Sequence, residues 1–591
     1  MPLSRAMRRN SRVSAASISV AAALVVLAPL GSALAQSLPP ASDPGRVQQR
    51  FEPPPQPRVT TDQILPLVEP ERQVNGGAAK IKFNLSAVTV VGSTVYDDKA
   101  LAEAWAGMVG HEISLADAQL IADRITTKYR NDGYILSRAV IPAQRISGGA
   151  LKIQVVEGYI KDFRIDGDFK PGFSGTLIGG IRAKLEAYAR QMVGARPITA
   201  KMMERYLLLA NDLPGVNAQA VLAPSQGNDP GAATLVIQAR KKTVDYFGSA
   251  DNFGSRYSGP YQGQVGMVLN SPLGLSERIG LRAINTIGDW NELHYLEGNW
   301  DQDIGSEGTK IGFGVAYSKS KPGNLNAPVD AIDGEVWTET FRVSHPLIRS
   351  RTMNLYLRGS FVWRDVDTTT DFGIPIKDER KDHLRVLRVG GSFDLVDRFR
   401  GVNFVDFEVS KGLPIFGYTH HDTGSSRPEG TADFTKVTAE VSRLQSLFVP
   451  GLSLYVAAQG QYSFNTLLSS EEFGVGGSQY GRGYDPSEIA GEQGIATKVE
   501  LQYGGPADFR FLKGYQFFAF WDYGKIWNKD KASKQDHTDR DSLMSAGAGV
   551  RLNFINEVSG EFYIAKPLTR DIAGRDNADN WRGFFTLTTR F

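Results

Sequence analysis

The stretch LSLYVAAQGQYSF at residues 452–464 decides the fold. Its even-numbered positions are Leu, Leu, Val, Ala, Gly, Tyr and Phe, whereas most of the odd-numbered positions are Ser or Gln. Successive side chains of a β-strand point to opposite faces, so one face of this segment meets an apolar environment and the other meets water. A transmembrane strand of a β-barrel has this pattern, because lipid lies outside it and a hydrated lumen lies inside.

The same alternation recurs from residue 243 to the end of the chain, for example at 353–363 and 495–503. About sixteen such segments can be counted, and an even number brings both ends of a barrel to one side. Short turns, as at 449–451, alternate with long polar loops, which is typical of a membrane barrel and unexplained in a soluble β-sandwich. The long loops are expected near 318–335, 364–382, 411–433, 466–491, 525–543 and 567–580.

The last strand supports this interpretation. Phe585, Leu587 and the terminal Phe591 share one face of an alternating segment. A final strand that closes on an aromatic residue is typical of bacterial outer-membrane barrels, and these three residues form the expected sorting signal. We therefore predict a transmembrane β-barrel of about 16 antiparallel strands over residues 243–591.

Residues 1–35 have the pattern of a secretory signal peptide. Four arginines precede an apolar core at 20–30, and Ala33-Leu34-Ala35 supplies the small-x-small cleavage pattern. The apolar core is too short for a membrane-spanning helix, which argues against an uncleaved anchor. Without these four arginines, 62 of the 66 basic side chains remain against 64 acidic ones, so no nucleic-acid partner is expected.

Cysteine is absent from the chain, which excludes disulfides, thiol chemistry and cysteine-bound metals. We find no serine-hydrolase, zinc-protease or nucleotide-binding motif, and the seven histidines are scattered. No catalytic residue, metal or cofactor is expected.

Between the signal and the barrel, the pattern changes twice. Residues 36–80 form a proline-rich linker, in which 43–51 could make one short helix with Pro44 at its first position or could stay unstructured. Residues 81–158 and 159–242 each have the order β-α-α-β-β, which predicts two modules of one topology. In the first, Ser114 and Asp117 form a capping-box pattern at the start of a helix.

The loop at 466–491 is rich in glycine, which permits it to fold back on itself. Near its middle is Arg482-Gly483-Tyr484. A later strand carries Phe520, Asp522 and Gly524 at alternate positions, which places all three toward the lumen.

The two modules, the barrel and these two motifs resemble the two-partner secretion transporters (the TpsB, FhaC/ShlB/HecB-like family). The runs at 131–134, 141–144 and 156–158 resemble its polypeptide-transport-associated (POTRA) domain, giving POTRA 1 at 81–158 and POTRA 2 at 159–242. Arg482-Gly483-Tyr484 is similar to the family's lid-loop motif, although Gly481 stands where valine is usual. Phe520-x-Asp522-x-Gly524 is similar to its barrel-strand motif.

The resemblance implies a bacterial outer-membrane pore with periplasmic POTRA domains. Its lid would be held inside the lumen by an Arg482–Asp522 pair, and 43–51 would take the place of a plug helix. The partner would be one secreted TpsA-type exoprotein with an N-terminal secretion domain, received on an open sheet edge and exported without ATP. Outer-membrane lipid and, during biogenesis, the barrel-assembly machinery would be further partners.

Two alternatives remain open. An outer-membrane insertase of the same superfamily would share the signal, the lid motif and the last strand, but typically has more than two modules. A passive porin or a receptor would need neither the paired modules nor the lid motif.

Overall fold

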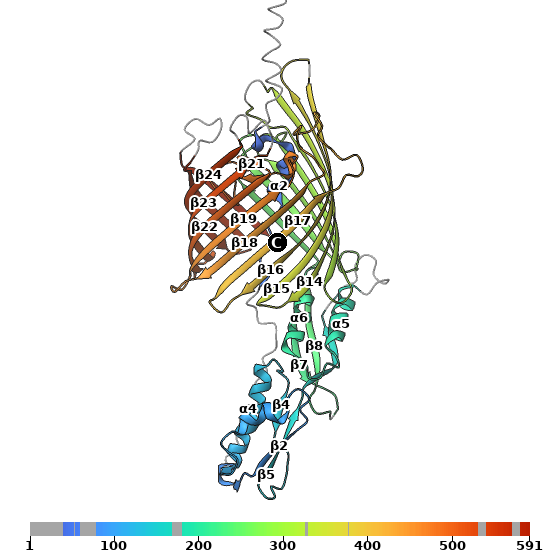
Figure 1. Cartoon of the computed structure of the whole chain (residues 1–591), viewed down its shortest axis with the longest axis vertical. Helices are drawn as coiled ribbons and strands as arrows, with labels where there is room; N and C mark the ends of the chain where they lie inside the picture. Colours follow the sequence, from blue (N-terminus) through green and yellow to red (C-terminus); the bar gives the residue numbers. More distant parts are fainter. Residues whose placement is uncertain are drawn as a thin grey trace, which may run out of the picture.

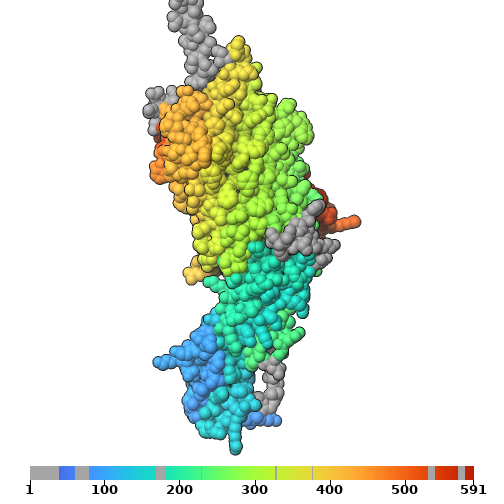
Figure 2. Space-filling view, turned by 90° about the vertical axis from the view of Figure 1, so that its right-hand side faces the viewer, coloured from blue at the N-terminus to red at the C-terminus, as the bar shows by residue number. Residues whose placement is uncertain are grey.

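The computed structural model describes residues 39–52, 54–59, 78–167, 169, 180–227, 229–325, 329–375, 377–529, 539–569 and 580–591. The predicted signal peptide lies outside the described residues. The chain forms a large barrel with two small α/β modules in a row below one of its ends (Figure 1). Figure 2 shows the modules continuing the long axis of the barrel.

The barrel is closed, and each strand pairs antiparallel with its neighbour in the chain, which confirms the predicted fold class. Closure comes from the last and first strands, which pair over five positions from Thr586–Asp251 to Arg590–Phe247. The sixteen strands are β9 (Val244–Asp251), β10 (Gln262–Asn270), β11 (Glu277–Thr286), β12 (Leu293–Ile304), β13 (Thr309–Ser320), β14 (Ala331–Arg349), β15 (Met353–Asp371), β16 (Lys377–Val396), β17 (Gly401–Gly412), β18 (Thr435–Ser446), β19 (Leu452–Ser463), β22 (Gln493–Pro506), β23 (Leu512–Trp527), β24 (Arg540–Phe554), β25 (Val558–Pro567) and β26 (Arg582–Arg590).

Strand β19 contains the segment that opened the sequence argument, and its two faces differ as expected. Val456 and Tyr462 are exposed on the outer wall, whereas Gln461 and Ser463 are buried toward the lumen. The outer wall is therefore apolar where lipid would contact it, and the inner wall is polar.

The expectation of a long loop at 364–382 was wrong. Strands β15 and β16 remain paired up to Asp371–Lys377, so the hairpin continues as strand well beyond the apolar part of the wall. A hairpin that has left the membrane meets water on both faces, so it loses the apolar alternation while its backbone hydrogen bonds continue. Polar sequence was mistaken for loop there.

The two modules repeat one connectivity. In each three-stranded sheet, the strand that comes last in the chain lies in the middle. It pairs parallel with the first strand and antiparallel with the second, in the orders β2-β5-β4 and β6-β8-β7. Their elements are β1 (Lys82–Asn84), β2 (Ala87–Val91), α3 (Asp98–Leu101), η4 (Ala102–Trp105), β3 (Glu112–Ser114), α4 (Leu115–Asn131), β4 (Arg138–Val140) and β5 (Ala150–Val156), preceded by η3 (Ala78–Lys80), and then β6 (Tyr159–Asp166), α5 (Gly180–Met192), α6 (Ala200–Asn211), β7 (Val216–Pro224) and β8 (Ala232–Lys241).

Helix α4 begins at the predicted capping box. The Ser114 hydroxyl accepts a hydrogen bond from the Asp117 amide, and the Asp117 carboxylate accepts one from the Ser114 amide. These hydrogen bonds hold the pKa of Asp117 below its usual value. The first module has two strands beyond the predicted order, because its first segment is divided into β1 and β2, and β1 pairs with the additional strand β3 in a separate two-stranded sheet.

No helix among the described residues is long and apolar enough to cross a membrane.

The second module is fixed to the barrel through the end of α6. Asp212 accepts two hydrogen bonds from the Arg349 guanidinium, both 2.8 Å long, and its carbonyl accepts one from Lys310. Arg205 and Tyr206 contact Glu307 in the turn between β12 and β13. The modules therefore lie under one half of the barrel rim, at the end where the connections are short.

Candidate functional site: a lid and a plug in the lumen

The connection between β19 and β22 folds into the lumen and forms a lid. It contains η5 (Ser469–Glu471) and a small hairpin of β20 (Phe473–Val475) and β21 (Ile489–Gly491). Val475 and Ile489 are buried in a cluster with inner-wall residues. Gly476, Gly477, Gly481 and Gly483 have φ between 86° and 120°, a conformation that residues with a β-carbon rarely adopt.

Arg482 lies at the tip of this lid and contacts Asp522 on β23. Its Nε and Nη2 donate to the two carboxylate oxygens over 3.0 and 2.8 Å, and its backbone amide donates to the same carboxylate over 2.9 Å. Both side chains are almost completely buried. The structure therefore brings the two predicted residues together in a bidentate pair, which fixes geometry as well as charge.

Sequence reasoning missed two charged partners of this pair. Nη1 of Arg482 donates over 2.5 Å to Glu500 of β22, which also accepts a hydrogen bond from Arg551 of β24. The pair is thus part of a larger network, in which Arg482 of the lid and Arg551 of the wall share Glu500. The alternation identified Glu500 as a lumenal residue, but only the strand register shows that it lies beside Asp522.

Phe520 and Gly524 support the lid in different ways. The Arg482 guanidinium lies 3.6 Å from the centre of the Phe520 ring, a favourable cation–π distance. A β-carbon at Gly524 would come within 2.3 Å of the Val475 side chain, so glycine there allows the lid hairpin to lie directly on the wall. All three residues of the strand motif face the lumen, as predicted.

Gly483 and Tyr484 contact the strands that follow β23 in the same wall. The Gly483 carbonyl accepts a hydrogen bond from Arg582 of β26, and the Tyr484 hydroxyl donates to the carbonyl of Met544 on β24. The next residue, Asp485, accepts a hydrogen bond from Arg582 over 2.8 Å. The lid tip is therefore bound by hydrogen bonds to several strands within the run from β22 to β26.

The residues of the expected sorting signal lie elsewhere, on the last strand. Leu587 and Phe591 are exposed on the outer wall, and Phe591 exchanges two backbone hydrogen bonds with Tyr246 of β9. The centre of the Phe585 ring lies 6.5 Å from the centre of the Tyr261 ring. None of the three takes part in the lid.

A second obstruction comes from the segment before the modules. It consists of η1 (Pro40–Ser42), η2 (Pro44–Arg46) and α2 (Val47–Phe51), and it lies inside the barrel near the end that carries the long loops (Figure 1). Pro44 is the first residue of η2, and the Asp43 carboxylate caps this turn by accepting a hydrogen bond from the Gly45 amide. A β-carbon at Gly334 on β14 would come within 2.1 Å of Pro44, so the segment packs closely on the wall. We call residues 40–51 the plug.

The plug contacts the lid directly. Arg46 is fully buried, donates to the Ser469 carbonyl over 2.8 Å and pairs with Glu472 at 3.3 Å. The neighbouring Glu471 pairs with Arg388 and Lys436 of the wall at 2.7 and 2.8 Å. One turn of the lid therefore joins the plug to the barrel wall.

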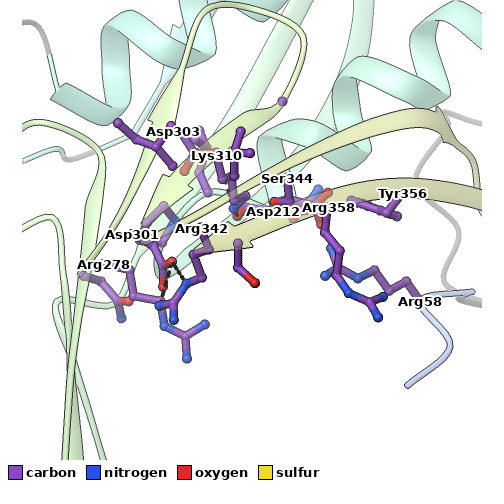
Figure 3. Close-up of a pocket in the computed structure, with 18 of the residues that line it drawn as sticks. Arg58, Asp212, Arg278, Asp301, Asp303, Lys310, Arg342, Ser344, Tyr356 and Arg358 are labelled. Carbon is purple, nitrogen blue, oxygen red and sulfur yellow. Dashed lines mark hydrogen bonds and ion pairs between the residues drawn. The ribbon is translucent and has the colours of Figure 1, made fainter. Parts of the chain in front are cut away.

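The chain then continues to the opposite end of the lumen. The Arg58 guanidinium lies 4.0 Å from the centre of the Tyr356 ring, beside the contact between the second module and the barrel. A cavity of about 720 Å³ opens here, lined by module residues 211–215 and by inner-wall residues. Figure 3 shows its charged lining, with Arg342 paired to Asp301 and with Arg58 entering from the linker.

Comparisons with known proteins agree with this architecture. The model of the haemolysin secretion/activation protein family ShlB/FhaC/HecB matches residues 231–552, and the model of the ShlB-type POTRA domain matches 83–158. The heme/hemopexin transporter protein HuxB of Haemophilus influenzae strain 86-028NP is 24% identical over 550 residues, which cover 89% of this chain and 92% of HuxB. The outer membrane transporter CdiB-2 of Burkholderia pseudomallei strain 1026b is 25% identical over 503 residues, which cover 80% and 79% of the two chains.

Among solved structures, CdiB from Escherichia coli shares the fold with a TM-score of 0.66 at 20% sequence identity, covering 98% of this chain and all of that one. The barrel, the POTRA-type modules and the inward-folded lid thus occur together in a chain whose larger part matches one family model. The chain belongs to the haemolysin secretion/activation (ShlB/FhaC/HecB) family of two-partner secretion transporters, outer-membrane barrels whose POTRA domains lie in the periplasm.

Proposed function

We propose that this outer-membrane transporter exports one exoprotein through its barrel, and that the lid and the plug both close the pore at rest. The observation that carries the proposal is the buried Arg482–Asp522 pair, since it joins a glycine-hinged loop to the inner wall. Release of the lid would open the lumen beside strands β22 to β26, and release of the plug would open the part beside β14. Transport would draw on folding of the exported chain outside the cell.

The partner is a secreted exoprotein of the TpsA type with an N-terminal secretion domain. HuxB is named as a heme/hemopexin transporter and HpmB of Proteus mirabilis as a hemolysin transporter, so relatives carry different cargo on one architecture. Insertion of the barrel itself would depend on the barrel-assembly machinery.

Gene deletion followed by an inventory of secreted and outer-membrane proteins tests this function. Loss of one large exoprotein, restored by the wild-type gene, supports secretion. A general loss of outer-membrane barrels would instead support the insertase alternative and would contradict the proposal.

The edge strand β7 of the second module is the place where we propose that the exoprotein pairs. Asn211 donates to the Ala218 carbonyl and accepts from the Ala218 amide, so it already imitates a neighbouring strand at this edge. Because backbone groups alternate in direction along a strand, those of Ala220 and Leu222 face the same open edge. An extended polypeptide could continue from there as a further strand.

Leu222→Pro removes one outward amide and leaves the hydrogen bonds to β8 in place. We expect secretion to fall while the amount of inserted barrel stays the same, as measured by immunoblots of medium and membranes. Val221→Ala, at an exposed side chain next to it, serves as the matched control. Undiminished secretion by Leu222→Pro would exclude this edge.

A further inference from the structure

Four phenylalanine rings project from the periplasmic rim of the barrel. Phe399, Phe448, Phe509 and Phe511 are 63%, 91%, 68% and 62% exposed. They lie in the turns β16–β17, β18–β19 and β22–β23, which follow one another around the barrel. We call these four residues the aromatic rim. An exposed apolar patch of this size marks contact with another surface.

The aromatic rim lies beyond the apolar outer wall. On the outer face near the turn β16–β17, Arg443 pairs with Asp397 at 2.6 Å, so charged groups already follow the last apolar residues of the strands. Tyr503, exposed on the outer face of β22, pairs in register with Leu452, close to the turn β18–β19. Tyrosines of membrane proteins concentrate at the level of the lipid headgroups, and the aromatic rim lies at or just past that level.

Basic side chains surround the aromatic rim. Arg398, Arg400 and Arg510 are exposed and make no ion pair with any residue that the structure describes. The Arg398 guanidinium lies 4.8 Å from the centre of the Phe399 ring. Lys513 adds a fourth exposed positive charge. Of the two acids in these turns, Asp397 is already paired with Arg443 and Asp508 is exposed, so positive charge is in excess. Rings interleaved with an excess of positive charge fit an interface that is partly apolar and negatively charged.

The second POTRA domain does not cover this part of the rim. It contacts the turn β12–β13 through Arg205 and the end of β14 through Asp212. In Figure 1 the ends of β18, β19 and β22 lie to the left of the domain, with open space below them. The aromatic rim is therefore continuous with the lipid-facing wall, and no part of the two modules that the structure describes covers its periplasmic side.

We propose that the aromatic rim binds the headgroup layer of the inner leaflet, with its arginines on anionic phospholipid such as phosphatidylglycerol. The phenylalanine rings insert between headgroups, and the guanidinium groups bind phosphates. This contact draws the POTRA-free half of the rim against the membrane. An arriving polypeptide then reaches the pore from the POTRA side alone. The inference concerns lipid and stands independently of the lid, the plug and the cargo.

The absence of native cysteine permits a direct test in the full-length protein. Phe448→Cys is labelled with an environment-sensitive dye, and the protein is placed in vesicles of phosphatidylethanolamine and phosphatidylglycerol that contain nitroxide lipids. We expect stronger quenching by a nitroxide near the headgroup than by one deep in the acyl chains. Val221→Cys, at an exposed apolar position on the second POTRA domain, is the reference in water, and its dye should be quenched by neither nitroxide lipid.

The arginines are tested by Arg398→Gln combined with Arg400→Gln and Arg510→Gln. Their removal should lower the preference of the protein for phosphatidylglycerol over phosphatidylethanolamine on the order of tenfold or more, because each basic group near an anionic surface contributes separately. Heat-modifiable migration on gels confirms that each variant is a folded barrel. If the dye at Phe448→Cys is quenched no more than the dye at Val221→Cys, the proposal is overturned. It is also overturned if an added exoprotein segment shields the dye while lipid nitroxides do not quench it.

Discussion

At the scale of single residues, the proposed closure of the pore would depend on one desolvated cation. Arg482 has two acidic partners, Asp522 and Glu500, and an aromatic ring beneath it. A charge taken out of water is costly unless it is fully paired, so removal of one partner leaves the others in an unfavourable state. This balance makes the lid sensitive to a single substitution.

Arg482→Ala should destabilise the inward lid by about 3–5 kcal/mol, the usual cost of breaking a buried pair. We expect a barrel that inserts normally, opens more often in planar bilayers and secretes poorly. Arg482→Lys keeps the charge but loses the bidentate geometry and should be intermediate. Wild-type export by Arg482→Ala would refute the proposed role of this pair.

Gly524→Val tests the close approach of lid and wall without changing any charge. Its side chain would meet Val475, whose nearest atom lies 2.3 Å from a β-carbon at this position. The lid hairpin should shift from the wall, and protease cleavage within 464–492 should become faster. Gly280→Val on β11, where no atom lies within 4 Å of the added β-carbon, is the matched control and should leave cleavage unchanged.

At the scale of elements, the sequence predicted most where two faces of a segment meet different surroundings. Strand β19 could be identified from its residues alone, because lipid and water select opposite side chains. The β15–β16 hairpin beyond the wall could not, since water on both sides removes that signal. The motifs identified Arg482 and Asp522. The contact of Glu500 with Arg482 depends on the register between β22 and β23, and the residue pattern of one strand does not reveal its register.

Helix α4 illustrates a local signal that was sufficient. Ser114→Ala removes the cap seen in the structure and should destabilise the helix by about 1 kcal/mol. Hydrogen exchange of the amides at 115–118 should accelerate, while exchange in α6, which has its own cap at Thr199, stays unchanged. Equal exchange of these amides in the wild-type protein and in Ser114→Ala would show that tertiary packing alone holds the first turn of α4.

At the scale of the whole molecule, plug and lid form one connected obstruction. A β-carbon built on Gly45 lies 3.4 Å from the β-carbon of Ser470, close to the separation found in disulfides. Gly45→Cys with Ser470→Cys should therefore cross-link plug to lid in a chain that has no other cysteine. Secretion should stop under oxidising conditions and resume with reductant, and each single variant should secrete normally. Full export by the cross-linked protein would mean that the plug need not leave.

The course of residues 40–59 has a consequence for how the protein is made. The plug, which contains α2, lies near the outer mouth and Arg58 lies near the inner one, so the chain passes along the bore before the POTRA domains begin. During biogenesis the cylinder must either close around its own leading segment or admit it afterwards. In both cases the first polypeptide to occupy the lumen is the N-terminal segment of the transporter itself, so the lumen is already wide enough for one extended polypeptide.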